Sequence, residues 1–208
     1  MPAAIPVAAG IVVMGSRPPP GGATCVPRFM RRLLAACLLA LPLLAYAAPR
    51  TCRVVGISDG DTFTALCDNG IRQEQIRVRF NAIDAPERQQ AFGTRARQAL
   101  SQLIFGKEVD LDCPKTDPYG RSVCRVMVAP NSAPDGPRTL DAGLAMLTIG
   151  MAWWYRAYAG EQTPQERGQY EFAEQEARAK RAGLWRDADP MPPWQWRQAR
   201  RTKPQGVN

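Results

Sequence analysis

Carboxylates and arginines are concentrated in three short segments. These are Asp-Gly-Asp-Thr at 59–62, Arg-Phe-Asn-Ala-Ile-Asp-Ala-Pro-Glu at 79–87 and Asp-Pro-Tyr-Gly-Arg at 117–121. The oxygens of Asp61 and Asp84 are the hard ligands that Ca²⁺ prefers, and Glu87 can act as a general base on water. The planar guanidiniums of Arg79 and Arg121 can each bind two oxygens of a phosphodiester. A cation, a base and two guanidiniums together have the chemistry of phosphodiester hydrolysis.

Each of these residues alone has an ordinary structural explanation. Asp84 and Glu87 could be the N-cap and first-turn acids of a following helix, and Arg121 could be a solvated charge at a strand end. The helix explanation does not account for the arginine-bearing strand that leads directly into Asp84. Asp61 stands at the start of a strand, where an unpaired buried carboxylate would be costly. We therefore predict that these residues form one site.

Short apolar and β-branched runs predict five strands and three helices. The strands are expected at 52–57, 62–67, 75–83, 109–113 and 123–128. The third run alternates apolar residues with Arg77 and Arg79, as expected of a strand with one buried face. Helical spacing of apolar residues predicts helices at 93–105, 140–149 and 163–182. This order indicates an α+β fold, mainly β, built on a five-stranded Greek-key barrel of the OB type with three α-helices.

Four cysteines follow an apolar run near the N-terminus. They are Cys52, Cys67, Cys113 and Cys124. If Asp59-Gly60 is the two-residue loop of a hairpin, the first two cysteines lie opposite each other. If Pro118-Tyr119 is the tip of a second hairpin, the last two do as well. Cross-strand pairs come close to disulfide distance, so of the three possible pairings we predict these two. A zinc site is disfavoured, because the chain has neither a Cys-x-x-Cys pair nor a histidine.

The first 47 residues have the composition of a leader rather than of a folded domain. Met30-Arg31-Arg32 opens an apolar run that ends in Ala45-Tyr46-Ala47, which is typical of a secretory signal peptide. The run is shorter than the roughly 20 residues of a membrane-spanning helix. We expect a signal at 30–47, with Met30 as the true start. We therefore expect a periplasmic or secreted protein with no stable membrane association after signal removal.

The rest of the chain is long enough for one well-buried domain. We expect this domain at 48–189, followed by a Pro-, Trp- and Arg-rich tail at 190–208. Four of the 27 basic residues and none of the 19 acidic residues lie in the leader. The mature chain therefore keeps a net charge of +4, which suits a polyanionic partner.

Taken in order, the three charged segments resemble the motifs of the thermonuclease family of staphylococcal nuclease-like proteins. The resemblance runs from about Cys52 to Trp185, nearly all of the mature chain. It implies a five-stranded OB barrel with three helices and Ca²⁺-dependent cleavage of DNA and RNA. The family's threonine in Asp-Thr-Pro-Glu is Ala85 here, which is harmless if only the carbonyl binds metal. Pro118 stands in place of a lysine near the nucleotide, so some phosphate affinity is lost.

The resemblance also implies a role for each site residue. The Ca²⁺ ligands would be Asp61, Asp84 and the carbonyl of Ala85. The catalytic residues would be the general base Glu87 and the phosphate-contacting Arg79 and Arg121. Asp59 resembles an acid that lies next to the metal ligands without binding the metal itself. Tyr119 resembles a residue beside the nucleotide phosphate. From the aromatic run at 153–158 we choose Tyr158 to stack on a base, and the tryptophans of this run can instead pack in the core.

These observations predict a monomeric, Ca²⁺-dependent nuclease of DNA and RNA. Because stacking on aromatic rings tolerates every base, we expect little sequence preference, with single strands favoured. The alternative is a catalytically silent OB module that binds nucleic acid or a protein. Such a module would be expected to lose some of the three carboxylates or two arginines named first above. All five of these residues are present in this chain.

Overall fold

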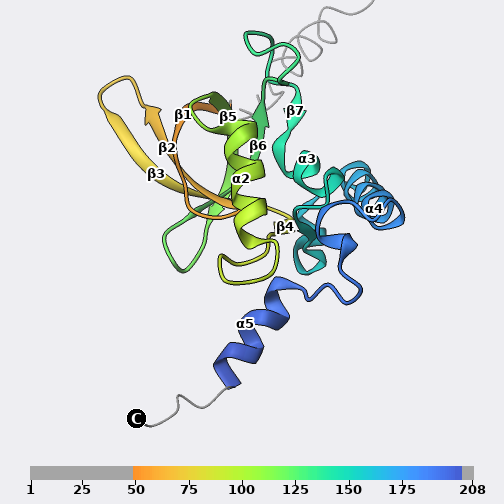
Figure 1. Cartoon of the computed structure of the whole chain (residues 1–208). Coiled ribbons are helices and arrows are strands. Elements are labelled where there is room, and N and C mark those ends of the chain that lie inside the picture. Colours follow the sequence, from red (N-terminus) through yellow and green to blue (C-terminus); the bar gives the residue numbers. More distant parts are fainter. Residues whose placement is uncertain (1–48, 203–208) are drawn as a thin grey trace, which may run out of the picture. The chain divides into compact units, whose positions relative to one another are not determined.

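The computed structural model describes residues 49–202 (Figure 1). The predicted signal peptide and the last residues of the predicted tail lie outside this range. None of the helices within it is both long and apolar enough to cross a membrane.

Five strands form a closed barrel. They are β1 (Arg50–Ile57), β2 (Thr62–Asp68), β3 (Gln73–Phe80), β5 (Glu108–Thr116) and β6 (Ser122–Val128). Neighbours in the order β3-β2-β1-β5-β6 pair antiparallel, and β3 also pairs with β6 in parallel, which closes the barrel. The short β7 (Leu140–Asp141) pairs antiparallel with β6, while β4 (Ile83–Asp84) pairs with β8 (Trp153–Trp154). The predicted five-stranded OB-type barrel is confirmed.

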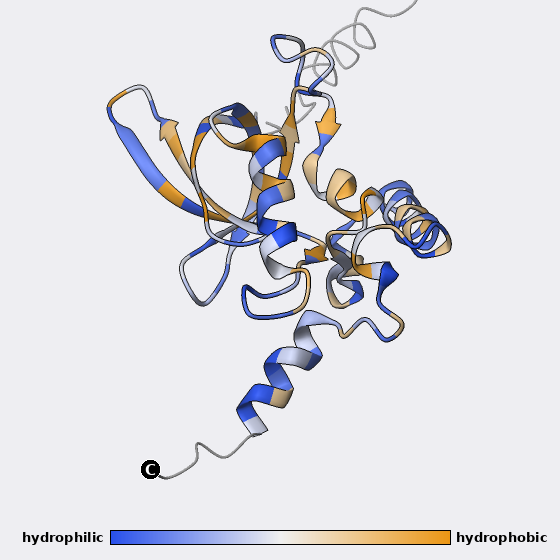
Figure 2. Ribbon diagram, in the orientation of Figure 1, coloured by the Kyte–Doolittle hydropathy of each residue, from blue (hydrophilic) through white to orange (hydrophobic). Residues whose placement is uncertain are grey.

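The three predicted helices are present, and a fourth lies in the predicted tail. The three are α2 (Gly93–Ile104), α3 (Ala142–Thr148) and α4 (Pro164–Ala179). Thr163 and Glu166 form a reciprocal capping box that fixes the start of α4. Two short 3₁₀ helices, η1 (Arg156–Glu161) and η2 (Gly183–Arg186), follow α3 and α4. The fourth helix, α5 (Pro193–Thr202), is hydrophilic along almost its whole length (Figure 2).

The barrel interior is filled by the inward-facing side chains of the strands. Phe63 of β2 and Phe80 of β3 are almost fully buried, with their ring centroids 5.6 Å apart. Ala96, Leu100 and Ile104 of α2, spaced by four residues, are buried against this core. The buried face of α2 and the inward-facing side chains of the strands therefore pack in one core. This core holds the ends of β2, β3 and β4 in place.

The first hairpin has the predicted register at its cysteines but not the predicted loop. The Ser58 N–H donates to the Thr62 carbonyl at 2.9 Å, so the loop has three residues, 59–61, rather than two. A β-bulge between Val54 and Gly56 absorbs the extra residue. The β1–β2 pairing beyond the bulge is therefore the predicted one, with Cys52 opposite its partner.

The second hairpin shows the same compensation. Asp117 and Arg121 are joined by a backbone hydrogen bond of 2.9 Å, so the predicted two-residue tip is wrong and the loop spans 118–120. Gly120 closes it with a φ of +74°, a left-handed conformation that glycine adopts without strain. A bulge between Asp112 and Lys115 restores the predicted register farther along the strands.

Both hairpins carry a disulfide. The structure joins Cys52 to Cys67, with a Cα–Cα distance of 4.3 Å, and Cys113 to Cys124, at 4.1 Å. This is the pairing that the hairpin registers predicted. Each bridge joins two adjacent strands that are also hydrogen-bonded to each other.

We expect reduction of the Cys52–Cys67 bridge to lower the free energy of unfolding by up to about 3 kcal/mol, because it closes a loop of 15 residues. Denaturant unfolding of the oxidised and reduced protein measures this difference. The Cys52→Ala/Cys67→Ala variant is the control: it lacks this bridge, so reductant can lower its stability only through Cys113–Cys124, and that part is subtracted. Peptide mapping without reductant that finds four free thiols would contradict the prediction.

Candidate active site

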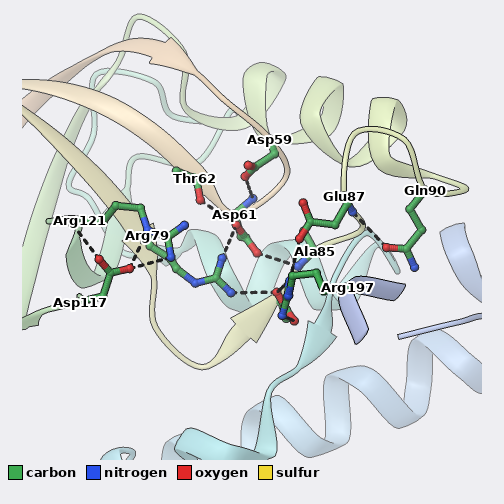
Figure 3. A network of polar contacts seen from close by, with 11 residues as sticks. Asp59, Asp61, Thr62, Arg79, Ala85, Glu87, Gln90, Asp117, Arg121 and Arg197 are labelled. Atoms are coloured by element: carbon green, nitrogen blue, oxygen red, sulfur yellow. Dashed lines mark hydrogen bonds and ion pairs between the residues drawn. The ribbon is translucent and has the colours of Figure 1, made fainter. Parts of the chain in front are cut away.

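One cavity of about 490 Å³ gathers most of the predicted site residues. Its lining includes Asp61, Arg79, Ala85, Glu87 and Arg121. They come from the start of β2, the end of β3, the segment after β4 and the β5–β6 loop, which meet at one end of the barrel (Figure 3). Asp84 lies beneath them and is fully buried. Segments that are far apart in the sequence thus form a single site.

Arg79 joins the two predicted metal ligands. Its Nη1 donates to Asp61 Oδ1 and its Nη2 to Asp84 Oδ1, both at 2.8 Å. The second oxygen of Asp61 accepts a hydrogen bond of 2.8 Å from the Ala85 N–H. The two carboxylates are only 3% and 0% exposed, so their charge depends on these partners rather than on water.

The three aspartates near this guanidinium have different proton affinities. Burial favours the neutral form of Asp61, but Arg79 and the Ala85 N–H more than offset it and lower the pKa of Asp61. Burial raises the pKa of Asp84, although Arg197 and Arg79 oppose this effect. Burial and the negative charge of Asp61 raise the pKa of Asp59 to about 7. Of the three carboxylates, Asp61 is therefore held most firmly in its charged form.

Glu87 is more accessible than the two predicted metal ligands, Asp61 and Asp84. Its side chain is 38% exposed, whereas the side chain of Asp84 is fully buried. A base that activates water needs this access. Glu87 Oε1 accepts a hydrogen bond of 2.7 Å from Arg197 Nη1.

Arg197 is a site residue that the sequence did not predict. It lies on α5, and its Nη2 donates to Asp84 Oδ2 at 2.7 Å, so one guanidinium bridges Asp84 and Glu87 (Figure 3). The only indication in the sequence was the mixture of tryptophan and arginine in the tail. Nothing in the local pattern identified which arginine enters the site.

Arg121 is held in place by Asp117, another residue without a predicted role. Asp117 Oδ2 accepts from Arg121 Nε and pairs with its Nη2, both at 2.7 Å, and Oδ1 accepts from the Arg121 N–H at 2.9 Å. Burial opposes the charge of Asp117, but the hydrogen bonds from Arg121 lower its pKa. The three-residue loop therefore presents Arg121 in a fixed orientation toward the cavity.

Both predicted nucleotide-contacting tyrosines line the same cavity. Tyr119 is 74% exposed, and the ring of Tyr158 is 41% exposed with Lys115 Nζ 4.2 Å from its centroid. By contrast, Trp153 and Trp154 are buried. The tryptophans thus pack in the core, while the tyrosines offer accessible rings.

The donor chemistry of the site fits a hard divalent cation. Within residues 49–202, no three His, Cys, Asp or Glu side chains are grouped so that they could hold a metal ion. The predicted ligand set needs only two carboxylates, Asp61 and Asp84, with the backbone oxygen of Ala85. Both carboxylates contact the Arg79 guanidinium, so their negatively charged oxygens, of the kind that Ca²⁺ prefers, already lie around one cation.

Comparison with known proteins agrees with this geometry. Residues 77–187 match the model of the family described as staphylococcal nuclease homologue. Protein ParB of Escherichia coli is 42% identical over 162 residues, which cover 76% of this chain and 87% of that protein. Micrococcal nuclease of Shigella flexneri is 42% identical over 171 residues, covering 82% and 92%. An uncharacterized endonuclease of Haemophilus influenzae is 37% identical over 170 residues, covering 80% and 85%.

The match to the family model covers more than half of the chain and includes the end of β3, the β4 segment and the β5–β6 loop. These are the elements that carry Arg79, Asp84, Glu87 and Arg121. The chain therefore belongs to the staphylococcal nuclease family, and the prediction of a nuclease of this type is confirmed.

Proposed function

We propose that this nuclease is Ca²⁺-dependent and hydrolyses DNA and RNA with little sequence preference. The observation that carries the proposal is the arrangement of Arg79, Glu87 and Arg121 around a pair of buried carboxylates in one open cavity. A catalytically silent binding module would have no need to keep these charges together, because burying them costs free energy.

Asp61, Asp84 and the Ala85 carbonyl would hold the Ca²⁺ ion. The bound ion would neutralise negative charge on the phosphate and help to orient water. Glu87, the accessible carboxylate, would accept a proton from the attacking water. The backbone N–H of Glu87 donates to Gln90 and its Oε1 accepts from Arg197, so the position of Glu87 at the cavity is fixed.

The two predicted arginines would stabilise the charge that develops on the phosphate oxygens. Arg79 uses two of its five N–H groups for the carboxylates, which leaves others for the substrate. Arg121 is fixed by Asp117 on one side of its guanidinium. Both side chains are largely buried, at 15% and 20% exposure, so their donors are preorganised in a partly dehydrated site.

The accessible rings of Tyr119 and Tyr158 support a preference for single strands. Stacking on a ring needs an unpaired base and works with any base. Among residues 49–202, we assign no side chain of the cavity to base recognition, which agrees with little sequence preference.

The two disulfides support a periplasmic or secreted location, because such bridges persist in oxidising compartments. We propose a signal peptide within the leader at 1–47, removed before the domain at 48–189 and its tail at 190–208 reach their destination. We further propose that the mature protein acts as a monomer, since one chain supplies every residue of the site.

The substitution Glu87→Gln should lower kcat by about 10²–10⁴-fold, because it keeps the shape of the side chain and removes its basicity. Steady-state cleavage of single-stranded DNA measures the change. Glu171→Gln, an exposed residue of α4, is the matched control and should leave kcat unaltered. Full activity of Glu87→Gln would show that another group accepts the proton.

Arg79→Lys and Arg121→Lys should each lower kcat by about 10²-fold or more, because a lysine cannot reproduce the paired donors of a guanidinium. The charge is unchanged, so simple attraction of the polyanion predicts almost no effect. Arg72→Lys, at the exposed β2–β3 turn, is the control. Small and equal effects at all three positions would reject the transition-state role.

Ca²⁺ should raise the melting temperature of the wild type, because a ligand that binds only the native state stabilises it. A chelator should abolish cleavage. Asp61→Asn should lose the thermal shift, and Asp135→Asn, on an exposed loop, should retain it. An equal shift in both variants would place Ca²⁺ away from Asp61.

A further inference from the structure

A second cavity adjoins the catalytic one, and apart from Glu87 its lining has no role in the proposed mechanism. It has a volume of about 370 Å³ and lies between α5 and the segment that follows β4. We call it the α5 groove, lined in particular by Arg88, Trp196, Arg197, Arg200 and Arg201. Arg197 and Arg201 line the catalytic cavity as well, so the groove continues directly from the catalytic cavity.

We infer that the α5 groove binds the nucleic-acid strand beyond the scissile phosphate, through its backbone phosphates and one stacked base. The inference rests on the proposed function, because it extends the same substrate along the surface. It assigns α5 a binding role that neither the sequence motifs nor the predicted catalytic residues suggest.

The charges of the groove suit a chain of phosphates. Among the side chains of residues 49–202, Arg88, Arg200 and Arg201 have no carboxylate partner: Arg88 donates to the Ser58 carbonyl, and Arg200 to the neutral side chain of Gln89. Arg197, Arg200 and Arg201 are spaced by three and four residues and so lie on one face of α5. An extended polyanion along this face would meet successive guanidiniums rather than a single one.

The groove also offers an aromatic ring among these charges. Trp196 is partly exposed, and the guanidinium of Arg200 lies 6.0 Å from its ring centroid. Proteins that bind single strands combine such a ring, on which a base stacks, with basic residues that follow the backbone. This combination favours an unpaired nucleic acid over a small anion or a lipid headgroup.

The position of α5 is fixed by its first turn. The ring of Trp194 lies 5.7 Å from that of Trp153 and 5.4 Å from that of Tyr155. Just before the helix, the Met191 carbonyl accepts a hydrogen bond of 2.5 Å from the Gln90 side chain. The arginines farther along the helix are therefore presented from an anchored support rather than from a loose tail.

The test is binding of the mature chain to labelled single-stranded DNA, in chelator so that no cleavage occurs. The probes are a trinucleotide and an oligonucleotide of about fifteen nucleotides. Arg88→Gln/Arg200→Gln, at two positions that line the groove but not the catalytic cavity, should bind the long probe at least about 10-fold more weakly than the wild type and the trinucleotide almost equally well. The slope of log Kd against log salt should become shallower by about 1.4, since each phosphate contact on a single strand contributes about 0.7.

The matched control is Arg72→Gln/Arg167→Gln, which removes the same charge from exposed sites outside both cavities. Equal affinity and salt slope in the two double variants would overturn the inference. So would binding of phosphatidylglycerol vesicles that only Arg88→Gln/Arg200→Gln loses while its affinity for the long probe is unchanged, because the groove would then face a membrane.

Cleavage by the wild type with Ca²⁺ separates this inference from the proposed function. If the wild type cleaves but the groove variant binds like its control, only the inference about α5 fails. If the wild type binds the long probe through the groove but does not cleave, only the proposed function fails. Absence of both cleavage and binding overturns both.

Discussion

The site depends on keeping two carboxylates charged in a place that water hardly reaches. Asp61 and Asp84 are buried at the end of the barrel, where an isolated charge would be strongly disfavoured. Arg79 makes this arrangement possible by contacting both. The β2–β3 pairing places Arg79 opposite Thr62, next to Asp61, so the barrel register itself determines that carboxylate and guanidinium meet. A shift of one residue would turn Arg79 to the other face of the strand.

Close packing at Gly60 also helps to hold Asp61 next to its partners. A Cβ atom at position 60 would come within 2.7 Å of the Cβ atoms of Ala85 and Ala96, so only glycine lets the loop lie against both neighbours. The loop between β1 and β2 is thereby pressed onto the segment after β4 and onto α2. This contact allows the Ala85 N–H to reach Asp61. The small side chain of Ala85, where the family motif has threonine, belongs to the same close contact.

The sequence predicted what local patterns encode and missed what depends on long-range contacts. Strand alternation and turn residues were enough for the barrel, and the capping box for the start of α4. The disulfide registers were correct although both predicted loops were one residue too short, because a bulge in each hairpin cancels the error. Arg197 could not be predicted in the same way. Its partner Asp84 is 113 residues away, and no periodic pattern encodes an ion pair between a tail helix and the end of a barrel.

The ion pairs of Arg197 also show how the net charge of the site would change when the site binds a ligand. Asp61, Asp84 and Glu87 carry three negative charges, and the guanidiniums in contact with them, Arg79 and Arg197, carry two positive charges. A divalent cation alone would change the net charge of these five groups from −1 to +1. One bound phosphodiester would then bring the balance to zero. A cation held by Asp84 would share its oxygens with Arg197, which donates to both of them. Under the proposed function, the charges of these five groups would therefore favour binding of metal and substrate together.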